Sequence, residues 1–104
     1  MITPSHFRPN LPAAAPVHLS IHGLVQGVGF RDALSLQALQ RGLHGWVRNR
    51  RDGSVEALVI GDDDHVAAII EACREGPFGA RITDIEITDA DDDSSVGFTP
   101  KPTL

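Results

Sequence analysis

The chain has 104 residues, of which 41 % are hydrophobic and 22 % are charged, a composition that fits one globular domain and excludes wholesale disorder. Nine Lys and Arg against fourteen Asp and Glu give a net charge of −5, so we expect no nucleic-acid partner and no membrane partner. The single cysteine, Cys73, cannot form an intramolecular disulfide, and no stretch resembles a signal peptide or a membrane span. A cytoplasmic location is therefore expected.

The first 16 residues contain four prolines and no hydrophobic period, which predicts a flexible proline-rich extension. Strict alternation begins at Val17 and continues through Leu19 and Ile21, as expected for a strand with one buried face. A glycine-rich loop over residues 23–29 follows, and apolar residues then recur at helical spacing from Phe30 to near position 42. The first part of the chain therefore predicts a strand, a glycine-rich loop and a helix.

The middle of the chain predicts two more strands, over residues 45–49 and 55–60, which we expect to be antiparallel neighbours. Between them, Asp52 and Gly53 are typical of a type I′ hairpin turn. A second helix is predicted after Asp62, with an apolar stripe that ends at Cys73.

Alternation around Ile85 and Ile87 predicts a fourth strand, and residues 96–98 predict a short last one. The order is then βαββαβ with a short fifth strand, followed by a tail over residues 100–104. This order is typical of a ferredoxin-like α/β sandwich of the α+β class, with an antiparallel sheet covered on one face by two helices. One domain over residues 17–99 is expected.

The glycine-rich loop is the best candidate for chemistry. It leads from a strand into a helix N-terminus, where free backbone N–H groups and the helix dipole favour an anion. Gly27 and Gly29 allow the backbone to curl closely around such a ligand. The Arg31 guanidinium can donate hydrogen bonds to two of its oxygens. The predicted second strand can bring Asn49 near the same loop. These residues favour a phosphate site, although a packing turn would satisfy the same pattern.

Three segments in this order resemble the acylphosphatase family, in its free-standing bacterial form: residues 23–31 (GLVQGVGFR), 42–49 (GLHGWVRN) and 52–56 (DGSVE). Residues 76–77 (GP) and 80–82 (ARI) fit the same pattern. The resemblance covers about residues 17–98. It implies a hydrolase without a metal or other cofactor that splits the carboxyl-phosphate bond of small acyl phosphates into a carboxylate and inorganic phosphate.

The resemblance also implies roles for individual residues. Arg31 becomes the phosphate-binding catalytic residue, and Asn49 becomes the residue that orients the attacking water. Backbone N–H groups of the loop would cradle the phosphate, namely those of Gln26, Gly27, Val28, Gly29 and Phe30. The sequence departs from the family pattern at Arg41, where a leucine is common, and in its N-terminal extension.

A different class of function stays open, namely a non-catalytic phosphate-binding or anion-binding regulatory module on the same fold. We expect a monomer.

The arginines at positions 48, 50 and 51 are interpreted as a solvated charged hairpin, and Trp46 as a packing residue. His18 and His22 would lie about 13 Å apart along a strand, too far to share one metal ion.

Overall fold

A computed structural model of the protein describes residues 16–76 and 79–104, and its elements follow the predicted order. Most of the predicted proline-rich extension, residues 1–15, lies outside the described residues. The elements are β1 (Val17–Leu24), α1 (Phe30–Gln40), β2 (His44–Asn49), β3 (Val55–Ile60), α2 (Asp63–Glu75), β4 (Arg81–Asp89) and β5 (Phe98–Pro100).

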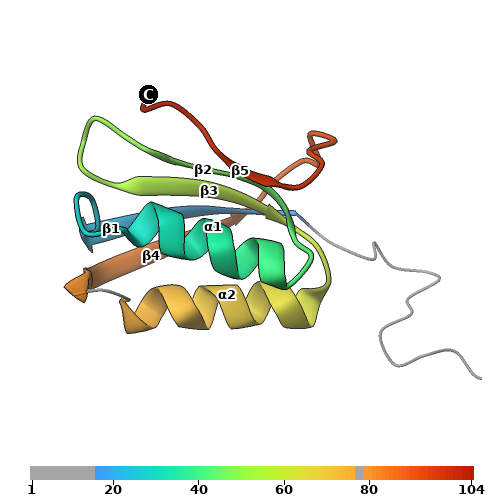
Figure 1. Cartoon of the computed structure of the whole chain (residues 1–104), viewed down its shortest axis with the longest axis horizontal. Helices are drawn as coiled ribbons and strands as arrows, with labels where there is room; N and C mark the ends of the chain where they lie inside the picture. Colours follow the sequence, from blue (N-terminus) through green and yellow to red (C-terminus); the bar gives the residue numbers. More distant parts are fainter. Residues whose placement is uncertain (1–15, 77–78) are drawn as a thin grey trace, which may run out of the picture.

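The five strands form one sheet in the order β4-β1-β3-β2-β5, and both helices lie side by side on one face of it (Figure 1). The predicted ferredoxin-like fold is confirmed. The expectation of a purely antiparallel sheet is wrong at one edge, because β5 pairs with β2 in parallel. The chain reverses after β4 and arrives at the opposite edge of the sheet, where its new direction is the same as that of β2. The sheet is therefore mixed.

Side chains alternate along each strand, so the sheet has two different faces. The face toward the helices is apolar, and its registers place Leu19 opposite Ala57 and Ile21 opposite Val55. These side chains are fully buried with Phe30 and Ile69 from the helices. The burial of this apolar surface is the main driving force for the fold.

Helix α2 has the clearest sequence signals, and each of them has a structural counterpart. The Asp62 carboxylate caps the helix by accepting a hydrogen bond from the Asp64 N–H at 2.9 Å. Cys73 is buried on its apolar stripe, and this burial raises the pKa of the thiol to about 12. The thiol is therefore neutral at physiological pH and serves as a small core side chain.

The predicted type I′ hairpin is wrong. The loop between β2 and β3 spans residues 50–54, and among them only Gly53 has a positive φ, of 93°, whereas a type I′ turn needs two such residues. The Asp52 carboxylate instead accepts hydrogen bonds from the Ser54 N–H at 2.9 Å and hydroxyl at 2.6 Å. The Gly53 N–H donates to the Arg50 carbonyl at 3.1 Å, and the Arg50 N–H donates to the Ser54 carbonyl at 2.8 Å, so the loop is longer than a two-residue turn.

The last described residues continue along β2 beyond β5. The Lys101 N–H donates to the Val47 carbonyl at 2.8 Å, and the Leu104 N–H donates to the Asn49 carbonyl at 3.2 Å. The backbone at Asn49 is thus held between β3 and the C-terminal segment. None of the helices in the described part of the chain is long and apolar enough to cross a membrane.

Candidate active site

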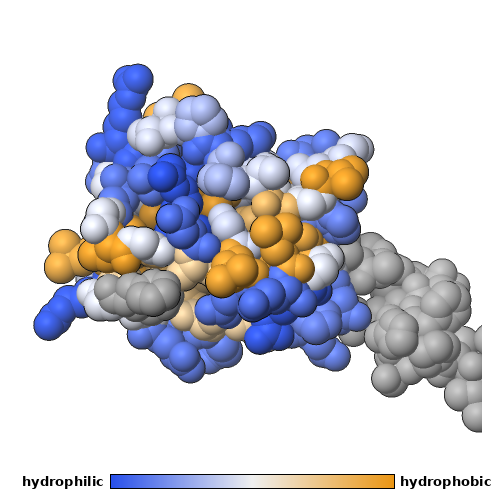
Figure 2. Space-filling model, viewed as in Figure 1, coloured by the Kyte–Doolittle hydropathy of each residue, from blue (hydrophilic) through white to orange (hydrophobic). Residues whose placement is uncertain are grey.

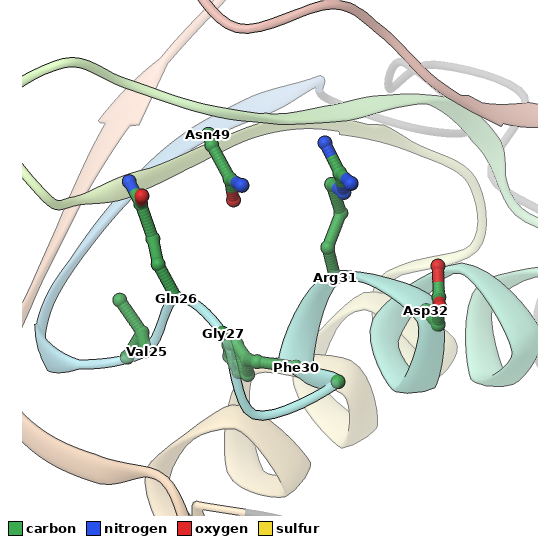
Figure 3. A pocket seen from close by; sticks show the side chains of 8 residues that line it. Val25, Gln26, Gly27, Phe30, Arg31, Asp32 and Asn49 are labelled. Atoms are coloured by element: carbon green, nitrogen blue, oxygen red, sulfur yellow. The ribbon is translucent and has the colours of Figure 1, made fainter.

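A cavity of about 240 Å³ opens between the loop that follows β1, the start of α1 and the end of β2. Three side chains converge on it, with Asn49 descending from β2 and with Gln26 and Arg31 rising from the loop and from α1 (Figure 3). The residues that line it are Val25, Gln26, Gly27, Gly29, Phe30, Arg31, Asp32 and Asn49. Six of the seven site residues expected from the sequence are therefore brought together here.

The shape of the loop depends on two glycines in the left-handed region. Gly27 has a φ of 77° and Gly29 a φ of 79°, a conformation that costs roughly 1 kcal/mol or more for residues with a side chain. Gly29 is also the N-cap residue of α1, and no side chain caps this helix. The N–H groups of its first turn, with the positive end of the helix dipole, are therefore available to an anion in the cavity.

Arg31 lies in the first turn of α1 and is half-buried. Within residues 16–76 and 79–104, its guanidinium makes no ion pair and no hydrogen bond. Asp32, the next residue, is exposed and lines the same cavity. The cavity thus combines an arginine without a protein partner and one acidic group at its edge.

Asn49 is the last residue of β2 and pairs with Val55 on the side of the sheet that faces the helices. Its side-chain oxygen Oδ1 is buried and has no hydrogen-bond partner in the described part of the chain. A buried carbonyl oxygen without a partner is costly, and it is satisfied when a water or a ligand donates to it. The structure therefore places a free acceptor beside the glycine-rich loop.

The Gln26 side chain has a function that the sequence did not predict. Its amide donates to the carbonyl of Arg50 at 2.7 Å and to the carbonyl of Ser54 at 2.8 Å. The glycine-rich loop is thus tied to the hairpin loop that directly follows Asn49. No local pattern could have indicated this contact, because its partners lie 24 and 28 residues away in the chain.

Val28 does not line the main cavity. It lines a shallower neighbouring depression together with Gly29, Asp32, Ala33 and Leu36. Gly29 and Asp32 border both spaces, so the depression adjoins the main cavity. No sequence motif singles out Asp32 or Leu36.

The arginines that follow Trp46 lie on the other face of the sheet or beyond it. Arg48 and Arg50 form ion pairs with the buried Glu56 at 2.6 and 3.1 Å. The interpretation as a solvated side chain is therefore wrong for Arg48, whereas Arg50 is 41 % exposed beside its ion pair and Arg51 is exposed. The Arg48 guanidinium also lies 4.7 Å from the centre of the Trp46 ring, which supports a packing role for this tryptophan.

The histidines of β1 have separate acidic partners. The His18 ring contacts Glu56 at 2.6 Å, and the His22 ring contacts Glu86 at 2.9 Å. No group of three or more His, Cys, Asp or Glu side chains within the described ranges is arranged to hold a metal ion.

Comparison with known proteins agrees with this geometry. The model of the acylphosphatase family matches residues 17–100. An acylphosphatase of Acidiphilium cryptum is 49 % identical over 86 residues, which cover 83 % of this chain and 94 % of that protein. An acylphosphatase of Azorhizobium caulinodans is 54 % identical over 70 residues, covering 67 % of this chain and 75 % of that protein.

A solved structure is similar as well. The crystal structure of the acylphosphatase from Bacillus subtilis superimposes with a TM-score of 0.79 at 34 % identity, and the match covers 83 % of this chain and 97 % of that one. The match to the family model extends over β1 to β5 and includes every residue that lines the cavity. The chain therefore belongs to the acylphosphatase family of enzymes.

Proposed function

We propose that the protein hydrolyses small acyl phosphates and that Arg31, Asn49 and the loop N–H groups perform the reaction without a metal ion. Water attacks phosphorus, the bond from phosphorus to the bridging oxygen breaks, and the products are a carboxylate and inorganic phosphate. Phosphoryl transfer asks a protein mainly to position the reactants and to stabilise charge on the phosphoryl oxygens. The cavity provides groups for both tasks.

The phosphoryl group is bound by the loop and by Arg31. The backbone N–H groups of residues 26–30 surround its oxygens, and the Arg31 guanidinium forks two of them with charge-assisted hydrogen bonds. Support for this assignment comes from the uncapped N-terminus of α1 and from the absence of a protein partner for Arg31 within the described ranges. In a protein with a net charge of −5, this local group of donors is what attracts an anion.

Asn49 orients the attacking water. Its Oδ1 is buried and unpaired, so it can accept a hydrogen bond from a water that lies over the phosphoryl group. A carboxamide is too weak a base to remove a proton from water. The proton therefore moves to a phosphoryl oxygen of the substrate, and no covalent intermediate with the enzyme forms.

The observation that carries the proposal is the convergence of two unpaired polar side chains, Arg31 and Asn49, on one uncapped helix N-terminus. Family membership supplies the reaction class. A cytoplasmic location and a monomeric state stay predictions from the sequence.

The test is the release of inorganic phosphate from acetyl phosphate and benzoyl phosphate in the presence of EDTA. We expect the wild type to be active, and Arg31→Gln to lower kcat/KM by about 1000-fold, the scale of losing a preorganised contact to a transferring phosphoryl group. Arg41→Gln is the matched control, because Arg41 is the C-cap residue at the other end of α1 and does not line the cavity.

Two outcomes would contradict the proposal. Loss of wild-type activity with EDTA that returns with added metal would contradict metal-free hydrolysis. Binding of phosphate without hydrolysis of either substrate would favour the alternative of a non-catalytic anion-binding module.

A further inference from the structure

The depression that adjoins the phosphate cavity is mostly apolar. It has a volume of about 340 Å³ and is lined by Val28, Gly29, Asp32, Ala33 and Leu36. Figure 2 shows hydrophobic surface over the same region of α1. The Leu36 side chain is 57 % exposed, so its apolar surface is open to a ligand in the depression.

The position of the depression relative to Asn49 fits the geometry of the reaction. In an in-line displacement, the leaving group lies on the side of phosphorus away from the attacking water. Asn49 lines the phosphate cavity only, whereas Val28 and Leu36 line the depression only. A phosphoryl group bound by the loop can thus direct its acyl substituent over Gly29 into the depression, away from the water held at Asn49.

The charge at the border between the two spaces is negative. Asp32 lines both the phosphate cavity and the depression, and its carboxylate is exposed. Because Asp32 borders both spaces, we expect an acyl group that extends from the phosphate cavity into the depression to lie near this carboxylate. A negatively charged acyl group is repelled there, while a neutral apolar one also gains contact with Val28 and Leu36.

We propose that this depression is the acyl-group subsite, that Val28 and Leu36 favour apolar acyl groups such as aromatic ones, and that Asp32 disfavours acyl groups carrying a second negative charge. The inference rests on the proposed function and adds the substrate class to it. Leu36 and Asp32 are specificity-determining residues in this arrangement, while the bond-breaking step stays with Arg31, Asn49 and the loop.

The first arm of the test compares acetyl phosphate with benzoyl phosphate. Leu36→Ala is expected to lower the ratio of kcat/KM for benzoyl phosphate to that for acetyl phosphate about fivefold, because the ring loses apolar contact. Leu39→Ala is the matched control: Leu39 is 53 % exposed, lies one turn further along α1 and does not line the depression. Its ratio is expected to equal that of the wild type. Comparing ratios between variants cancels the different reactivities of the two substrates.

The second arm compares benzoyl phosphate with 4-carboxybenzoyl phosphate, which differ only by a carboxylate at the far end of the ring. Asp32→Asn is expected to raise the relative kcat/KM of the charged substrate about fivefold at low salt, and the gain is expected to shrink as salt screens the charges. This arm does not depend on the leucine variant and tests the border of the subsite by itself.

The outcomes separate the two proposals. Wild-type hydrolysis of both neutral substrates supports the proposed function, whatever the ratios are. If Leu36→Ala and Leu39→Ala then give the same ratio and Asp32→Asn leaves the charged substrate unchanged, the acyl subsite is refuted while the enzyme stands. If the wild type hydrolyses neither substrate, the proposed function and this inference are both overturned. Circular dichroism of each variant confirms that it is folded.

Discussion

Two polar clusters lie at the sheet, and they differ in whether their polar groups have partners within the protein. In the Glu56 cluster, formed by Glu56, His18, Arg48 and Arg50, the acid makes three ion-pair contacts of 2.6, 2.6 and 3.1 Å. In the phosphate-loop site, formed by residues 25–31 and Asn49, Arg31 and the Asn49 oxygen have no partner among the residues described. The charges of the Glu56 cluster are paired within the protein. The polar groups of the phosphate-loop site are instead complementary to an anionic ligand and a water. Unpaired polar groups, rather than charge alone, thus set the phosphate-loop site apart from a structural network.

The pKa of Glu56 illustrates the paired case. Burial raises the pKa of this carboxyl, but hydrogen bonds from Arg48 and His18 and the charges of Arg48 and Arg50 outweigh that effect, so its pKa is lowered. The carboxylate is thus more stable in the folded state than in water. Such a group contributes to stability and leaves no capacity for a ligand.

After the loss expected for Arg31→Gln, the strongest effect is again on activity and comes from the phosphate-loop site. Asn49→Ala is expected to lower kcat about 100-fold, because the water loses the acceptor that orients it. The free energy of unfolding is expected to stay within about 0.5 kcal/mol, since the removed oxygen has no partner to lose. Steady-state kinetics and urea denaturation measure the two quantities. A variant with normal kcat would remove Asn49 from the proposed mechanism.

The next effect is on stability and comes from the Glu56 cluster. Glu56→Gln is expected to lower the free energy of unfolding by about 2 kcal/mol at pH 7, because a nearly buried acid loses its ion pairs. Its kcat is expected to change less than threefold, because Glu56 does not line the phosphate cavity.

The same variant has a pH dependence with a defined sign. The folded-state pKa of Glu56 lies below its ordinary value of 4.5, so its contribution is complete above pH 4.5 and is lost as the pH falls through the folded-state pKa. Denaturation curves of wild type and variant are therefore expected to converge in acid. Glu71→Gln serves as the control, since Glu71 is exposed and its contact with Arg74 is 3.6 Å long. An equal loss in both variants at pH 7 would contradict the special role of Glu56.

A smaller effect on activity tests how the phosphate-loop site is held in place. Gln26→Ala removes the two hydrogen bonds that tie the loop to residues 50 and 54. We expect kcat/KM to fall about tenfold and inhibition by inorganic phosphate to weaken in parallel, because the cradle loses its fixed distance from Asn49. Gln40→Ala, an exposed change at the end of α1, is the control. If phosphate inhibition is unchanged at a temperature where both variants are folded, Gln26 has no positioning role.

Local sequence patterns were sufficient for the elements but failed where distant segments meet. The alternation from Val17 and the Asp62 cap with its apolar stripe determined β1 and α2, because side-chain periodicity and capping act within one element. The parallel pairing of β5 was missed, since it depends on which edge of the sheet the chain reaches after β4. The type I′ turn was wrong because the backbone closes a longer loop, in which the Arg50 N–H donates to the Ser54 carbonyl.

The order of the elements and the glycines that shape the loop could be predicted from the sequence. Three motifs also indicated the family and its reaction class. These properties depend on backbone conformation and on residue types at short spacing. The folding of the chain decides that Arg48 and Arg50 pair with Glu56, that Gln26 ties the two loops together, and that Asp32 lies at the border of the cavity and the depression. The physical reason is that each of these contacts depends on the folding of strands and helices against one another, and not on the spacing of residues within any one of them.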